Sequence, residues 1–165
     1  MGTPFTQVYN RFLGKITDDM YMELTPEDTI RDLRNLLIDA IPGFEFPRQN
    51  LLDYSIDTTT ENALEETSSF TAELTSEEVN ILAILMMINW TQRQVTSIEN
   101  TRMKYSGSDF KFTSQANHLS KLLNLLSETQ RQSHHMQRLY KRRRFDDGGK
   151  YESNWSVLRE TSALD

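Results

Sequence analysis

The sequence predicts a mainly α-helical protein: a four-helix bundle with two long helices, an extended or β-hairpin excursion between the second and third helices, and a flexible C-terminal tail. Three observations predict this fold. Apolar residues recur at three- and four-residue steps in several stretches, one stretch is apolar almost all round, and residues 44–74 lose the helical period. We expect residues 1–144 to form one helical domain and residues 145–165 a docking tail.

The stretch Thr75–Trp90 is predicted to be the central buried helix. Thr75 and Glu78 have the spacing of a capping box, in which each side chain binds a free backbone amide at the start of the helix. The apolar run that follows is about twelve residues long, and a bilayer span needs roughly 18 or more. A core helix is therefore favoured over a membrane span. A thinner apolar stripe continues this helix as an amphipathic segment to about Lys104.

Two amphipathic helices are predicted before the excursion. The first begins after Thr3-Pro4, where proline suits the first helical position, and reaches about Glu23, with a possible break at Thr17–Asp19. The second begins at Thr25-Pro26 and carries one apolar stripe to Ile41, after which Pro42-Gly43 ends it. Both helices offer an apolar face to cover the central one.

Residues 44–74 are predicted to form an excursion with an acidic tip near Thr58–Ser69. Alternation from Phe70 to Leu74 is typical of a short strand. A connection of this length within a compact domain is commonly functional.

A last helix is predicted from Thr113 to about Arg144. Its leucine-rich half, Leu119–Leu126, is expected to join the core. Its polar part, Gln130–Gln137, is expected to project past the domain. The glycines and aspartates after Phe145 are typical of a flexible linker.

Charge divides the chain into two unlike halves. The net charge is −6, but residues 1–80 hold five basic and sixteen acidic residues, whereas residues 81–165 hold thirteen basic and eight acidic ones. Opposed charges suit head-to-tail packing of identical subunits or two different partners; they also fit ordinary solvated faces. The segment Arg138–Arg144 carries five cations, which could bind phosphate, an acidic protein surface or the helix dipole.

The residues give no sign of catalysis. The chain has no cysteine, no glycine-rich phosphate loop and no G-x-S-x-G or H-E-x-x-H motif. The adjacent His134 and His135 point about 100° apart on a helix, so they cannot both hold one metal ion unaided. We expect no enzyme activity, no metal and no cofactor. An N-terminal secretory signal is not expected either, because charges are spread through residues 1–20.

Five stretches resemble head–tail adaptor (connector or neck) proteins of tailed bacteriophages. They are FTQVYNRFLGKITDDMY, IRDLRNLLIDAIPGFEFPR, LTSEEVNILAILMMINWTQRQ, SIENTRMKYSGSDFKFTSQANHL and RQSHHMQRLYKRRR. The resemblance covers about residues 4–144, apart from the loop at 57–70. It implies a structural virion protein, assembled in the bacterial host cytoplasm, that forms a ring of about twelve subunits below the portal and joins head to tail. Genomic DNA would pass through the channel without sequence-specific recognition, and no membrane is involved.

The resemblance also implies which residues meet each partner. The portal-binding candidates are Arg138, Lys141, Arg142, Arg143, Arg144, Tyr151, Trp155 and Leu158. The candidates for contact with a neighbouring subunit, a stopper or a tail component are Phe44, Phe46, Tyr54, Phe70, Arg93 and Arg102.

Two other structural roles compete with this one. A small terminase-like subunit would also form a helical ring and would bind packaging-site DNA, but the acidic N-terminal half is unfavourable for that role. A neck stopper or tail-completion protein usually has a β-rich body, which the helical pattern does not favour.

Overall fold

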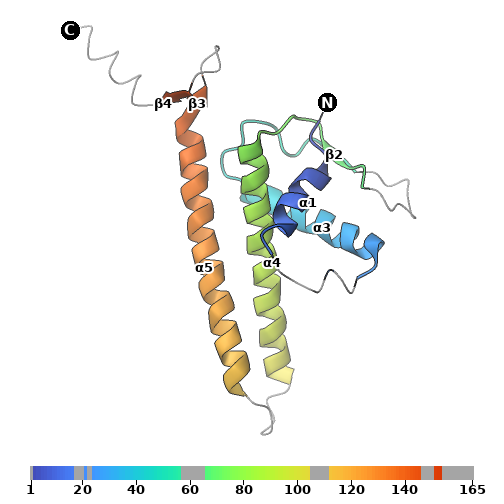
Figure 1. Ribbon diagram of the computed structural model, residues 1–165, viewed down its shortest axis with the longest axis vertical. Helices are drawn as coiled ribbons and strands as arrows, with labels where there is room; N and C mark the ends of the chain where they lie inside the picture. The colour runs from blue at the N-terminus through green and yellow to red at the C-terminus, as the bar shows by residue number, and fades with distance from the viewer. Residues whose placement is uncertain are drawn as a thin grey trace, which may run out of the picture.

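The computed structural model describes residues 2–16, 21, 24–56, 66–104, 112–145 and 151–153, and within them the chain is mainly helical. Figure 1 shows two long antiparallel helices, α4 and α5, with α1 and α3 packed beside the upper half of α4. In chain order the elements are α1 (Phe5–Leu13), α3 (Pro26–Ala40), the 3₁₀ turn η1 (Ile41–Gly43), β1 (Tyr54–Ser55), β2 (Ser69–Phe70), α4 (Ser76–Lys104), α5 (Phe112–Arg142), β3 (Arg143–Phe145) and β4 (Tyr151–Ser153).

The predicted capping box is confirmed at the start of α4. The Glu78 amide donates to Thr75 Oγ1 at 3.3 Å, and the Thr75 amide donates to Glu78 Oε2 at 2.7 Å. The start of α3 is also as predicted, with the Asp28 amide donating to Thr25 Oγ1 at 3.2 Å. These contacts satisfy amides that a helix start leaves without partners.

The first helix is shorter than predicted. α1 ends at Leu13, and the Lys15 amide donates to the Phe12 carbonyl at 2.8 Å in a tightened last turn. Gly14 stands at this end, and glycine is a poor helix former because ordering it costs more backbone entropy. The prediction of one helix to Glu23 is therefore wrong; the proposed break at Thr17–Asp19 lies outside the described residues, and Tyr21 is helical again.

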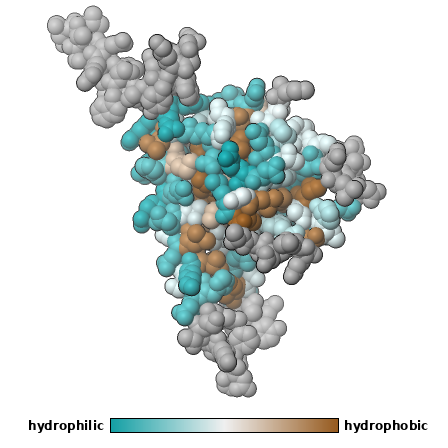
Figure 2. Space-filling model, in the orientation of Figure 1, coloured by the Kyte–Doolittle hydropathy of each residue, from teal (hydrophilic) through white to brown (hydrophobic). Residues whose placement is uncertain are grey.

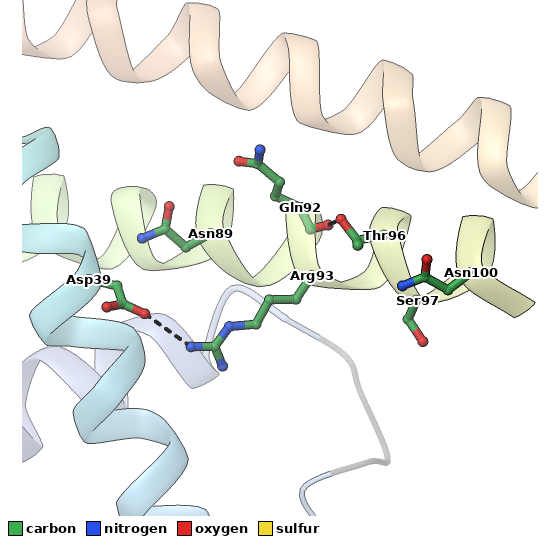
Figure 3. A pocket seen from close by; sticks show the side chains of 7 residues that line it. All are labelled: Asp39, Asn89, Gln92, Arg93, Thr96, Ser97 and Asn100. Atoms are coloured by element: carbon green, nitrogen blue, oxygen red, sulfur yellow. Dashed lines mark hydrogen bonds and ion pairs between the residues drawn. The ribbon is translucent and has the colours of Figure 1, made fainter.

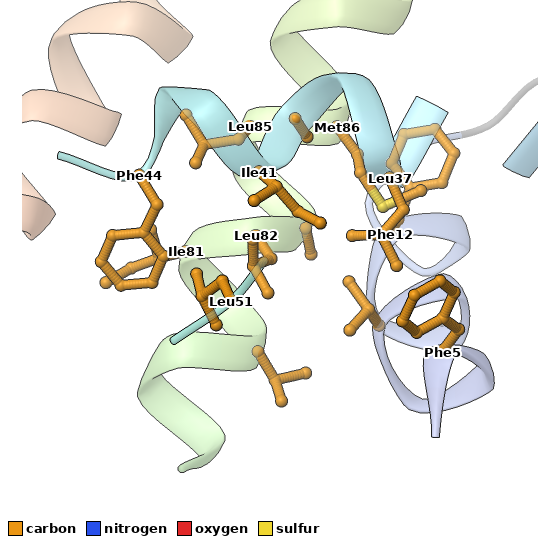
Figure 4. Packing of buried hydrophobic residues seen from close by; sticks show 14 of the residues in the cluster. Phe5, Phe12, Leu37, Ile41, Phe44, Leu51, Ile81, Leu82, Leu85 and Met86 are labelled. Atoms are coloured by element: carbon orange, nitrogen blue, oxygen red, sulfur yellow. The ribbon is translucent and has the colours of Figure 1, made fainter. Parts of the chain in front are cut away.

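The core lies between α1, α3 and the first half of α4, as Figure 4 shows. Phe5 and Phe12 of α1 and Leu37 of α3 pack with residues of α4, and each of these side chains is fully buried. The α4 residues that meet them are Val79, Ile81, Leu82, Ala83, Leu85 and Met86. The prediction that Thr75–Trp90 begins an enclosed helix within one chain is confirmed.

A short antiparallel pair of strands closes the excursion. β1 and β2 pair antiparallel, with Tyr54 opposite Phe70. The rings of Phe5 and Phe70 lie 4.7 Å apart between centroids, and those of Phe5 and Tyr54 lie 5.8 Å apart. The predicted strand over Phe70–Leu74 is only Ser69–Phe70. Residues 57–65, most of the predicted acidic tip, lie outside the described residues.

An ion pair joins the segment just before β2 to α3. Arg34 of α3 donates to both carboxylate oxygens of Glu66 at 3.0 Å, and the Glu66 side chain is almost completely buried. The hydroxyl of Tyr9 in α1 lies 3.5 Å from Glu66, and burial is the main reason that the pKa of Tyr9 is raised. A bidentate pair of this kind fixes geometry as well as charge.

The two halves of α5 have exchanged their predicted positions: the half expected in the core projects, and the half expected to project packs on the body. The polar part packs on the body of the protein, where Thr129, Ser133 and Gln137 are buried. The leucine-rich part extends with the second half of α4 beyond α3, and Leu123 and Leu125 are 44% and 40% exposed. The antiparallel direction causes this, because the C-terminal end of α5 lies beside the start of α4.

The end of α5 also differs from the prediction. The helix stops at Arg142, and Arg143–Phe145 pair antiparallel with Tyr151–Ser153. The first residues of the predicted tail are thus part of a small strand pair. Within the described ranges, no helix is long and apolar enough to cross a membrane.

Candidate functional site

A surface rich in positive charge lies where the last turns of α5 meet the segment after η1. Arg138, Lys141 and Arg142 are exposed on α5. The ammonium of Lys141 lies 3.9 Å from the ring centroid of Phe46, which is 39% exposed. A cation over an aromatic face is held by the charge distribution of the ring. We call this surface, made of Phe46, Arg138, Lys141 and Arg142, the basic end.

Tyr140 anchors the basic end to the body. Its ring is buried and packs edge-on against Phe44, with 5.5 Å between centroids. Its hydroxyl donates to Glu78, the buried carboxylate of the α4 capping box. Burial, followed by the hydrogen bond to Glu78, raises the pKa of Tyr140. The hydroxyl therefore stays protonated and keeps α5 fixed to the start of α4.

Arg48 holds the basic end from the other side. Its guanidinium lies 4.4 Å from the Tyr140 ring centroid. It donates to the Tyr140 carbonyl at 3.2 Å and to the Arg143 carbonyl. These carbonyls belong to the last turn of α5 and to the residue that follows it, where a helix leaves acceptors free. Arg48 thus stabilises the helix end and adds a cation to this region.

The polar residues of the last part of α5 have internal partners. Gln137 accepts a hydrogen bond from the Glu45 amide at 2.7 Å, and it donates to the Gly43 carbonyl and to Ser133 Oγ at 3.2 Å each. A buried amide of this kind is tolerated because its donors and acceptors are satisfied. The polar sequence of this part of α5 therefore reflects a buried network.

The basic end has more cations than nearby anions. Arg143 forms an ion pair with Glu77 at 2.7 Å, and His134 Nδ1 lies 3.2 Å from Glu45. In the described part of the chain, Arg138 and Arg142 have no carboxylate within ion-pair distance. This leaves exposed positive charge that an anionic partner could meet.

The structure brings together only part of the predicted portal-binding set. Arg138, Lys141 and Arg142 share the last turns of α5, and Arg143 follows directly as the first residue of β3. Arg144 and Tyr151 lie on the paired strands, opposite Glu152 and Phe145. Trp155 and Leu158 lie outside the described residues.

The predicted subunit or tail contacts are scattered. Phe44 and Phe70 are core residues, 4% and 0% exposed, so their assignment as surface contacts is wrong for the folded chain. Tyr54 is half-buried against Phe5. Phe46 belongs to the basic end, and the backbone of Arg102 lies in the last turn of α4.

Arg93 lines an open groove of about 740 Å³ on α4 (Figure 3). The guanidinium forms ion pairs with Asp32 at 2.8 Å and Asp39 at 3.3 Å, both on α3. The other residues that line the groove are Asn89, Gln92, Thr96, Ser97 and Asn100, all uncharged. The groove is a polar surface without a catalytic arrangement.

Sequence reasoning missed the roles of Arg48 and Tyr140, and it missed the exposure of Leu123 and Leu125. A heptad repeat that continues past the leucines is the signal that could have found Tyr140. The residues of α5 at its inward positions are buried or half-buried: 119, 122, 126, 129, 133, 136 and 140. Arg48 carries no local signal, because its contacts are far away in the sequence. In the described ranges, no group of three or more His, Asp or Glu side chains could hold a metal ion.

Comparisons with known proteins gave no match: no family model fits the chain, and no curated protein or solved structure is significantly similar to it.

Proposed function

We propose that this chain is a structural virion protein of a tailed bacteriophage, a head–tail adaptor that forms a ring below the portal. In this proposal the complete chain is a four-helix bundle with a hairpin excursion. The basic end faces the portal, and the ring, expected to hold twelve subunits, extends the DNA channel toward a stopper or tail component. The chain acts as a scaffold and not as an enzyme.

The observation that carries the proposal is the surplus of positive charge at a rigidly held helix end. Tyr140, Arg48 and Gln137 fix the last turns of α5 to the body, while Arg138 and Arg142 remain exposed. Preorganised charge gains affinity for a partner because little ordering is needed on binding. The resemblance of five sequence stretches to phage adaptors supports the choice of the portal as that partner.

A portal-binding assay tests the proposal. Purified chain is mixed with portal rings, and complexes are measured by native mass spectrometry and electron microscopy. We expect rings of the chain on one face of the portal, and weaker binding, by about tenfold or more, when Arg138 and Arg142 are both replaced by Glu. Arg131→Glu is the matched control, because Arg131 is an exposed arginine on α5 outside the basic end.

The deletion of residues 145–165 tests the role of the tail separately. Unchanged portal binding after this deletion would remove Tyr151, Trp155 and Leu158 from the portal contact. A wild-type chain that does not bind the portal would contradict the proposal. Tight, sequence-preferring DNA binding would favour the terminase-like role instead.

A further inference from the structure

The projecting half of the α4–α5 pair exposes apolar side chains on two sides. Leu119 is buried, and Leu122 and Leu126 are half-buried along the seam with α4. Leu123 and Leu125 are two positions apart, which places them about 200° apart around the helix. They therefore lie on opposite sides of the seam, and Figure 2 shows apolar residues at the surface of this lower part of the molecule.

Each of these two leucines shares its side of the helix pair with one charged residue, and the two charges have opposite signs. Lys121 lies four positions before Leu125, so the two side chains share one face of α5. On α4, Glu99 follows the seam residue Ile98, just as Leu123 follows Leu122. In an antiparallel pair, positions that follow the seam on both helices lie on the same side. We name these two surfaces the Leu123 flank, with Glu99, and the Leu125 flank, with Lys121.

The charges of the two flanks are free to meet a partner. Glu99 and Lys121 are exposed, and neither forms an ion pair in the part of the chain that the structure describes. The contacts of Glu78 with Tyr140 and of Asn80 with Met136 set the register of the helices. This register places Glu99 within about one helical turn of the level of Lys121.

We infer that the two flanks bind each other between copies of this chain, the Leu123 flank of one copy against the Leu125 flank of the next. Apolar contact would bury both leucines, and Glu99 of one copy would pair with Lys121 of its neighbour. Because the two surfaces differ, the contact is heterologous, and repetition of it gives a ring or an open chain of subunits and not a closed dimer. The inference assigns a surface to the ring of the proposed function, on which it rests.

Complementary variants test the contact. Leu123→Glu and Leu125→Glu each block one flank of an otherwise complete chain. We expect each variant alone to be monomeric by light scattering and analytical ultracentrifugation, where the wild type forms higher oligomers. An equimolar mixture should form a one-to-one dimer, because one intact flank of each kind remains. Circular dichroism confirms that the variants are folded.

Two further variants make the test specific. Leu52→Glu is the control, because Leu52 is 74% exposed but lies outside the flanks, and it should leave the oligomers unchanged. Glu99→Lys should weaken association about tenfold at low salt, and addition of Lys121→Glu in the same chain should restore it.

Several results would overturn the inference: a monomeric wild type, full oligomers from either leucine variant, or a mixture that stays monomeric. Portal binding is measured separately, so its outcome decides the proposed function on its own. Wild-type rings that persist in both leucine variants would overturn the assigned surface and leave the ring itself intact.

Discussion

The two halves of the α4–α5 pair invert the usual relation between sequence and burial. Beside the body, α5 is polar in sequence, yet Ser133 and Gln137 are buried and hydrogen-bonded. In the projecting half, α5 is rich in leucine, yet Leu123 and Leu125 are exposed. Burial in these helices therefore follows from where a segment lies in the fold and not from its hydrophobicity alone.

The body half has its neighbours within the chain. α4 is covered there by α1 and α3 on one side and by α5 on the other. The projecting half of α5 has only α4 beside it in the described structure, and one helix cannot cover an apolar arc that reaches both sides of the seam. Copies of the chain are the occupants that we propose for the uncovered sides.

The same leucine truncation should give very different results in the two halves, and the body half should give the largest effect. Leu82 is fully buried in the same core cluster as Leu37. Leu82→Ala should lower the free energy of unfolding by about 2–5 kcal/mol, because it removes apolar contacts and leaves a cavity. Urea denaturation measures this loss. A loss below about 1 kcal/mol would mean that the body is loosely packed and does not differ from the projecting half.

The buried polar contact between α4 and α5 should give the next largest effect. Tyr140→Phe removes the hydroxyl that donates to Glu78 and accepts from the Arg48 amide. Both partners would lose a hydrogen bond in a buried setting, so we expect about 1–3 kcal/mol of destabilisation by the same measurement. A neutral result would show that the polar network contributes little to holding the helices together.

High pH should weaken the body through its buried tyrosines. Burial raises the pKa of Tyr9 and of Tyr140 above the ordinary value near 10. The unfolded chain then releases these protons first, so the stabilisation is complete below about pH 10 and is lost as the pH rises toward the raised pKa values. Melting temperatures from pH 8 to 11 should fall at the alkaline end, and Tyr140→Phe should reduce the slope. An unchanged slope in this variant would contradict the role of Tyr140.

The smallest effect on the single chain is expected in the projecting half. Leu125→Ala should change the free energy of unfolding of a dilute, monomeric sample by about 1 kcal/mol or less, because Leu125 is already 40% exposed to water. At concentrations where copies associate, the same variant should reduce oligomer formation. A large loss of stability in the monomer would show that Leu125 has an intramolecular partner.

Local signals in the sequence predicted the elements well. The capping box of α4, the proline at the start of α3 and the apolar run of α4 are properties of neighbouring residues, and each appears in the structure at the expected place. A non-helical excursion was also predicted, because Gly43 and the loss of period mark a break in helix, and the structure has a small pair of strands there. The end of α1 before Gly14 was not predicted, because a glycine within an apolar stripe is often tolerated in a helix.

Long-range placement could not be predicted in the same way. α5 contains one leucine-rich and one polar segment, and hydrophobicity alone favours the first as core. The direction of α5 relative to α4 decides which segment packs on the body. This direction depends on contacts between residues far apart in the sequence, such as Tyr140 with Glu78 and Arg48 with the end of α5. Phe44 and Phe70 were misassigned for a related reason, because loop aromatics can fold back into the core.

Hydrogen exchange along α4 and α5 tests the division into a self-sufficient body and a projecting half most directly. In dilute, monomeric samples we predict slow amide exchange at 79–86 and 133–140, and faster exchange at 95–104 and 117–126. At concentrations where copies associate, the projecting half should become protected and the body should stay unchanged. Equal protection along both helices in the monomer, independent of concentration, would contradict the division into a self-sufficient body and a projecting half.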